Sequence, residues 1–225
     1  MENIDRLLTL MTGDEKHSRA SFSTLDVIQV LYERVLDVSP DLVDDPGRDR
    51  FLLSKGHGPT AYYAVLCDRG FFPESWLSKW GSFDSPLGYH PDRNLVPGVE
   101  ISSGSLGHGL PLGVGMALGL RAQGLSSRVV VLVGDAELDE GSNHEALELA
   151  PALGLDALTV VVIDNRSTSY AVPGRIAERF ATEGWHVTTV DGRDQDALEK
   201  ALAERGVGVP RAVVATVLDE EDLAA

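Results

Sequence analysis

RVVVLVGD at residues 128–135 and ALTVVVIDN at residues 157–165 are short runs rich in valine, leucine and isoleucine that lack a regular polar alternation. Strands buried on both faces have this composition, whereas strands with one wet face alternate apolar and polar residues. Residues 140–153, between the two runs, are predicted to form a helix. Strand, helix and strand at this spacing predict an α/β fold, a three-layer doubly wound parallel sheet with helices on both faces.

The remaining segments extend the same pattern along the chain. Helices are predicted at residues 24–36 with Ser23 as N-cap, 60–68 ended by Gly70, 106–123, 176–183 and 195–205, and further strands at 185–190 and 211–218. Residues 71–103 are rich in Gly, Pro, Asp and Ser and are predicted to form a long functional loop. No linker or repeat divides the chain, so one domain over residues 1–225 is expected.

The chain is strongly acidic, with 35 Asp and Glu against 19 Lys and Arg and a formal charge of −16. Its long-range field repels polyanions, so nucleic acid and acidic membranes are poor partners. A phosphate-bearing ligand would need a local cation or a helix N-terminus. No apolar run reaches the length of a membrane span or signal core, and the single Cys67 is interpreted as a buried core thiol. A reduced, cytoplasmic location is expected.

Polar residues follow the two strands at the point where each strand ends. Asp135 and Asn165 offer the oxygen ligands that Mg²⁺ or Ca²⁺ takes, and Gly134 lets the backbone approach a phosphate closely. Ligands bind at the carboxyl edge of parallel sheets. On these residues alone, an ordinary turn remains an alternative to a diphosphate site.

Three longer blocks carry a resemblance to a known family. Residues 134–165, GDAELDEGSNHEALELAPALGLDALTVVVIDN, resemble the thiamine diphosphate motif, which opens with GDG and closes with Asn. FLLSKGHGPTAYYAVLCDRG at 51–70, HPDRNLVPGVEISSGSLGHGLPLGVGMALG at 90–119 and GDAELDEGSNHEA at 134–146 are each similar to a transketolase block, in the family's order. The resemblance covers residues 22–217 and is strongest to transketolases split into two subunits. It implies the diphosphate-binding domain of the thiamine diphosphate-binding fold.

The resemblance also implies roles for individual residues. A Mg²⁺ or Ca²⁺ ion bridging the diphosphate would be held by Asp135, Asn165 and the backbone carbonyl of Ser167. The residues implied to bind thiamine diphosphate are His57, Gly104, Ser105, Leu106, Gly134, Asp135, Ala136, Glu137 and Asn165. The family usually has Gly where Ala136 stands. The histidines implied to act as catalytic residues near the thiazolium and the substrate are His57, His90 and His17, each with a structural role as the alternative.

Three further residues have weaker implied roles. Glu140 matches a glutamate at the family's subunit interface, with a solvated helix carboxylate as the alternative. His108 would lie near the diphosphate, and His144 is interpreted as a packing or interface residue.

The activity implied is that of a transferase that moves a two-carbon ketol unit from a ketose to an aldehyde. In this family the glutamate that contacts the pyrimidine ring belongs to a second domain. The resemblance therefore implies a separate C-terminal partner subunit with the pyrimidine-binding and C-terminal domains. It also implies an α2β2 heterotetramer and a chain that is inactive by itself.

Two departures from the family leave alternatives open. The loop after Asn165 is short, and the chain stops soon after residue 217, which favours a specialised enzyme. One alternative is a subunit of a 2-oxo acid decarboxylase or acyl-transferring enzyme, because the same cofactor motif serves both. The other is a non-catalytic scaffold, which the altered sequence after His17 would allow.

Overall fold

The computed structural model describes residues 2–12, 21–56, 58–168 and 172–218. Five strands form one sheet in the order β1-β2-β3-β5-β4, and every neighbouring pair is parallel. The strands are β1 (Arg50–Leu53), β2 (Val129–Gly134), β3 (Leu158–Asp164), β4 (His186–Asp191) and β5 (Arg211–Thr216). The predicted α/β fold with a parallel sheet is confirmed.

Successive side chains of the central strands enter two separate apolar cores, because residues along a strand point alternately to opposite faces. In β2, Val130 and Leu132 join one core, while Val131 and Val133 join the other. The helices of the first core are α1 (Glu2–Leu10), α3 (Leu25–Val30), α4 (Thr60–Asp68) and α8 (Gln195–Ala203). Those of the second are α5 (Gly109–Ala122), α6 (Gly141–Ala152) and α7 (Arg175–Thr182).

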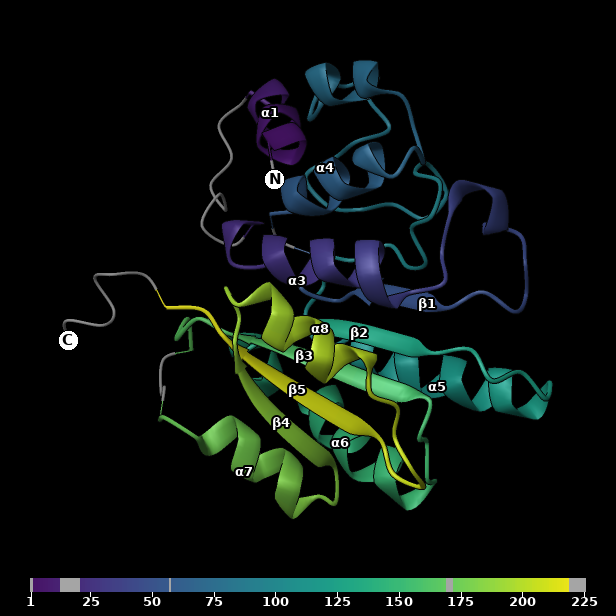
Figure 1. The fold of residues 1–225 in the computed structure, drawn as a ribbon, viewed down its shortest axis with the longest axis vertical. Helices are drawn as coiled ribbons and strands as arrows, with labels where there is room; N and C mark the ends of the chain where they lie inside the picture. Colours follow the sequence, from purple (N-terminus) through teal and green to yellow (C-terminus); the bar gives the residue numbers. More distant parts are fainter. Residues whose placement is uncertain (1, 13–20, 57, 169–171, 219–225) are drawn as a thin grey trace.

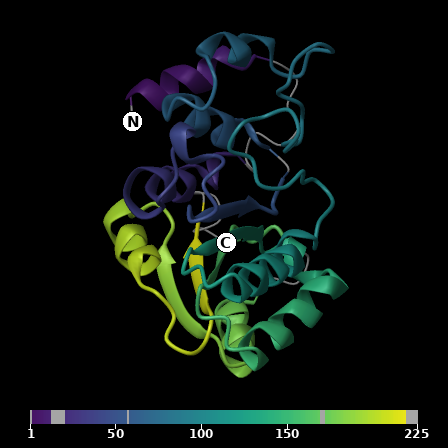
Figure 2. The ribbon, with the colours of Figure 1, turned by 90° about the vertical axis from the view of Figure 1, so that its right-hand side faces the viewer.

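The views agree with this layering. In Figure 1 the helices α1, α3 and α4 lie on one side of the sheet and α6 and α7 on the other. Figure 2, at right angles, shows the sheet between α8, in yellow-green, and α5, in teal. None of the helices in the described ranges is long and apolar enough to cross a membrane.

The predicted elements are present with some corrections. The helix predicted over 24–36 consists of α3 and a π-helical turn (Leu31–Val35), and Thr24 rather than Ser23 precedes α3. The helix predicted from residue 106 begins only at Gly109, because contacts described below hold the preceding residues in a loop. Cys67, expected in the core, is only partly buried. Residues 71–103 form the predicted long loop, which contains one 3₁₀ turn (Glu74–Lys79).

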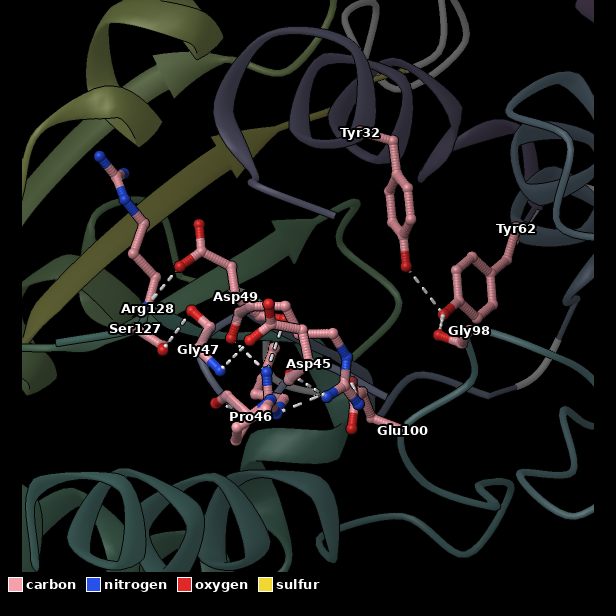
Figure 3. Close-up of polar contacts among 12 residues, drawn as sticks. Tyr32, Asp45, Pro46, Gly47, Asp49, Tyr62, Gly98, Glu100, Ser127 and Arg128 are labelled. Atoms are coloured by element: carbon pink, nitrogen blue, oxygen red, sulfur yellow. Dashed lines mark hydrogen bonds and ion pairs between the residues drawn. The ribbon is translucent and has the colours of Figure 1, made fainter. Parts of the chain in front are cut away.

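A polar network closes the amino edge of the sheet (Figure 3). The buried Asp49 carboxylate accepts the N–H of Arg128 at 2.7 Å and the N–H of Asp37 at 3.0 Å, which ties the residues before β1 and β2 together. Glu100 pairs with Arg48 at 2.7 Å. Because Glu100 lies near the end of the 71–103 loop, this ion pair anchors the loop where it turns toward the opposite edge.

Candidate functional site

The carboxyl ends of β1, β2 and β3 meet at one edge of the sheet. The N–H of Ser54, just after β1, donates to the carbonyl of Leu132 in β2 at 2.9 Å. The N–H of Asp135, just after β2, donates to the carbonyl of Ile163 in β3 at 3.0 Å. The strand ends that carry the polar residues of the predicted site are therefore held side by side.

Two glycines allow the first two sequence blocks to touch. A Cβ added to Gly56 would lie 2.5 Å from the Ser103 Oγ and 2.6 Å from the Gly104 nitrogen. A Cβ added to Gly104 would lie 2.5 Å from the His90 ring, and Gly104 has a φ of +123°, which disfavours other residues. The contacts place the exposed His90 directly against the loop that is predicted to pass beside the cofactor.

Glu137 connects this loop to the ends of β1 and β2. The residue is 1% exposed, and groups from three segments surround its carboxylate. Oε1 accepts hydrogen bonds from the Ser54 hydroxyl and from the Gly107 N–H at 2.9 Å, and Oε2 accepts the Gly134 N–H at 3.3 Å. Burial raises the pKa of Glu137 above its ordinary value, although these three donors and the positive charge of Lys55 oppose the shift.

Further bonds fix the same loop in place. The Ser142 hydroxyl donates to the Gly107 carbonyl at 2.6 Å, so both polar groups of the Gly107 peptide backbone have partners from the segment after β2. The Gly109 N–H, at the start of α5, donates to the Ser54 Oγ at 2.9 Å. The loop is thus attached to β1 and to the segment after β2 through its backbone.

Lys55 brings a positive charge into this part of the acidic chain. The residue is 8% exposed, and its aliphatic stem lies against Gly134, where an added Cβ would be 3.2 Å from its Cδ. Burial lowers the pKa of Lys55 to about 8, although the charges of Asp135 and Glu137 oppose the shift. With a pKa of about 8, Lys55 is mostly charged at neutral pH, so a cation lies beside the end of β2.

The residues predicted to hold a metal ion fit that role in part. The Asp135 carboxylate is 3% exposed and accepts hydrogen bonds from the Ser167 N–H at 2.7 Å and from the Ser167 hydroxyl. Within the described part of the chain, the buried Oδ1 of Asn165 has no hydrogen-bond partner. An orphaned amide oxygen beside a carboxylate suits a hard cation. The same ranges contain no cluster of three or more His, Cys, Asp or Glu that could hold a metal, so a site here depends on amide and carbonyl oxygens as well.

A cavity of about 500 Å³ opens on the α7 side of Asp135. Its walls include Asp164 and Thr216 at the strand ends and Arg175 and Arg179 of α7. Burial raises the pKa of Asp164. Asp135 therefore lies both at the end of β2 and on the wall of this cavity.

The structure brings most of the predicted cofactor residues to this edge. Gly104, Ser105 and Leu106 lie on the loop before α5, Gly134 ends β2, and Asp135, Ala136 and Asn165 follow β2 or β3. His17 and His57 lie outside the described residues.

The structure also places His108, Glu140 and His144, the three residues with weaker implied roles. His108 immediately precedes α5, and Glu140 precedes α6. His144 Nδ1 lies 2.7 Å from the Arg179 guanidinium, and both residues line the cavity.

Ser54, Lys55 and Ser142 were not predicted as site residues. A signal for the first two was present, because FLLS at residues 51–54 is an apolar run that ends in polar residues, like the run before Asp135. A strand of four residues is too short to show an alternating pattern. The contact of Ser142 with the loop depends on the turn between β2 and α6, which the sequence pattern does not specify.

Comparisons with known proteins agree with this geometry. A family model described as the transketolase, thiamine diphosphate binding domain matches residues 7–215. The chain is 51% identical over 217 residues to Ferredoxin fas2 of Rhodococcoides fascians, covering 96% of this chain and 71% of that protein. It is 41% identical over 150 residues to a subunit of the apulose-4-phosphate transketolase of Actinobacillus succinogenes, covering 67% of this chain and 54% of that one.

Solved structures give the same result. The transketolase from Leishmania mexicana superposes with a TM-score of 0.75 at 26% identity, covering 95% of this chain and 36% of that one. A transketolase from Pichia stipitis in complex with sedoheptulose-7-phosphate superposes with a TM-score of 0.76 at 26% identity, covering 88% of this chain. The chain spans 36% of each of these two transketolases.

Proposed function

Because the chain belongs to the transketolase family, as its thiamine diphosphate-binding domain, we propose that it is the N-terminal subunit of a split transketolase-like enzyme. The reaction is the transfer of a two-carbon ketol unit from a ketose donor to an aldehyde acceptor. The observation that carries the proposal is the joining of three sequence blocks at one sheet edge, where Gly56 packs on Gly104 and Glu137 links Ser54 to Gly107.

Thiamine diphosphate is the cofactor, and when bound it supplies the electron sink for breaking a carbon–carbon bond next to a carbonyl. Its diphosphate is held by the loop at residues 104–106 and the segment at 134–136, with Lys55 as the nearby cation. Mg²⁺ or Ca²⁺ is held by Asp135, Asn165 and the carbonyl of Ser167. The orphaned Asn165 Oδ1 supports this ligand set.

Of the histidines in the described ranges, His90 is the one placed to act on substrate. The residue is exposed and its ring packs on Gly104, which places the imidazole beside the loop assigned to the cofactor. There an imidazole holds a sugar hydroxyl or accepts its proton. His17 and His57 are proposed to share this role.

A second chain completes the active site. Three relatives are named as single subunits of transketolases, and the chain spans 54% of one of them and 36% of the transketolases of known structure compared above. We place the pyrimidine-binding and C-terminal domains on a separate partner chain, in an α2β2 heterotetramer. The chain without that partner is expected to be inactive.

The metal site is tested by Asp135→Ala. Loss of this carboxylate is expected to abolish Mg²⁺-dependent binding of thiamine diphosphate in calorimetry while the circular dichroism spectrum stays that of the parent protein. Asp156→Ala, an exposed carboxylate at the other edge of the sheet, is the control and is expected to bind normally. Normal cofactor binding by Asp135→Ala would disprove the assigned site.

The reaction class is tested on the complex with its partner chain. Release of an aldehyde from a ketose donor, dependent on thiamine diphosphate, is the expected result. Carbon dioxide released from a 2-oxo acid instead would assign the complex to the decarboxylating enzymes. Turnover of neither substrate class would point to a scaffold.

A further inference from the structure

Glu137 differs in its surroundings from the two acidic residues that follow it in the same segment. Asp139 and Glu140 are exposed, whereas Glu137 is 1% exposed and both of its carboxylate oxygens accept hydrogen bonds within the chain. Asp135 is also buried, but its carboxylate accepts hydrogen bonds from Ser167 after β3, whereas the donors to Glu137 lie after β1, before α5 and at the end of β2. The role of Glu137 is therefore assigned from the segments that its carboxylate connects.

The family resemblance implies that Glu137 binds the cofactor; we propose instead that Glu137 is a positioning residue, which sets the geometry of the cofactor site without touching the cofactor. Its three donors come from three different segments: Ser54 after β1, Gly107 in the loop before α5, and Gly134 at the end of β2. These segments are distant in sequence, and each carries or adjoins residues assigned to the diphosphate. One carboxylate thus fixes the relative positions of all three.

The chemistry of a carboxylate suits this arrangement. An ionised carboxylate only accepts hydrogen bonds, and all three converging groups are donors. A glutamine of the same shape would keep an oxygen for Ser54 and Gly107 but would turn an N–H₂ group toward the Gly134 N–H. Two donors would then face each other in a buried place, which is costly.

The consequence reaches the cofactor loop through Gly107. With its N–H bound to Glu137 and its carbonyl bound to Ser142, the Gly107 backbone has one orientation, and residues 104–106 precede it directly. Because this loop is already ordered before the ligand binds, no binding free energy is lost in ordering it. Glu137 therefore strengthens cofactor binding through preorganisation.

This inference rests on the proposed function, and its test separates the two. Affinity for thiamine diphosphate with Mg²⁺ is measured by calorimetry on the protein in the assembly in which it is isolated. Amide hydrogen exchange of Gly107 is measured without ligand. Glu137→Gln is expected to weaken affinity about 10- to 100-fold, as for other residues that orient ligands indirectly, and to speed exchange at Gly107. Ser54→Ala, which keeps the carboxylate, is expected to change both quantities in the same direction by smaller factors.

The matched control is Asp49→Asn at the opposite edge (Figure 3). Asp49 is also a buried carboxylate that accepts two backbone N–H groups, so its loss lowers the melting temperature as well. Its cofactor affinity is expected to stay within about twofold of the parent, because the site is remote.

Affinity unchanged in Glu137→Gln would overturn the positioning role. Weakened affinity with unchanged exchange at Gly107 would overturn it too, because Glu137 would then act by direct contact. Failure of the parent protein to bind the cofactor would instead refute the proposed function, and this inference with it.

Discussion

Lys55, Asp135 and Glu137 form a group of buried charges under the site. Each is less than a tenth exposed, and the charges of Asp135 and Glu137 act on Lys55. Removing one partner of such a group leaves another charge uncompensated, which destabilises a protein more than replacing the whole group. Single substitutions here therefore need a separate measurement of stability beside any measurement of function.

The reactivity of the Cys67 thiol is expected to depend on pH. Burial, together with the nearby carboxylates Glu74 and Asp68, raises the pKa of its thiol from 9.0 to about 11. Because the thiolate is the reactive form, alkylation of the native protein at pH 8 is expected to be about 100-fold slower than that of an ordinary thiol. The rate should rise with pH until about pH 11. The chain has one cysteine, so labelling with iodoacetamide followed by mass spectrometry reports on Cys67 alone.

The urea-unfolded chain provides the reference for this rate. Its thiol ionises near the ordinary value, so the unfolded state loses its proton first as the pH rises, and stability falls between about pH 9 and 11. Equal alkylation rates for the native and unfolded protein at pH 8 would contradict this assignment.

Residue types at the site could be predicted from the sequence better than side-chain directions. Asp135 and Asn165 follow strands, so their placement at the edge follows from the sheet alone. Glu137 follows only two residues after Asp135, and whether its side chain faces out or in depends on the 3₁₀ turn (Ala136–Asp139) that carries it. Local patterns do not specify that turn, which is why Glu137 could be named but its interior position could not.

At the scale of elements, α5 shows how the same residue type has two different uses on one helix. Gly113 faces the sheet, where an added Cβ would lie 2.5 Å from Cγ2 of Val131. Gly115 is exposed and an added Cβ would meet no described atom within 4 Å. One glycine permits close packing, while the other only lowers helix stability.

This difference predicts opposite effects of the same substitution. Gly115→Ala is expected to raise the free energy of unfolding by about 0.5–1 kcal/mol, because alanine restricts the unfolded chain and favours the helix. Gly113→Ala is expected to lower it by about 1–3 kcal/mol through overpacking. Urea denaturation followed by circular dichroism measures both. A neutral Gly113→Ala would mean that α5 does not pack on β2 as described.

Long apolar strands were the elements most easily predicted. β2 and β3 are buried on both faces along nearly their whole length, which matches their continuous apolar composition. β1 has four residues, too short for a pattern. The sequence predicts that α5 starts at residue 106, but it starts at Gly109 because side chains from other segments hold the loop before it. Tertiary contacts, rather than local propensity, decide such boundaries.

At the scale of the whole molecule, the net charge of −16 and the cationic Lys55 under the site act in opposite directions on an anionic cofactor. The distant charges are screened by salt, whereas buried groups are screened much less. Local devices therefore determine binding: Lys55, the loop backbone and the metal ligands proposed here. The partner chain is expected to cover this edge, where His90 and the loop at residues 104–106 are accessible.

We propose that this chain holds thiamine diphosphate in a complex with a second, different chain. The test is native mass spectrometry of the protein purified from its own cells, in buffer with Mg²⁺ and thiamine diphosphate. The expected complex contains two copies of this chain, two copies of a different chain and the mass of the bound cofactor. Self-association of this chain alone, with no cofactor bound, would contradict it.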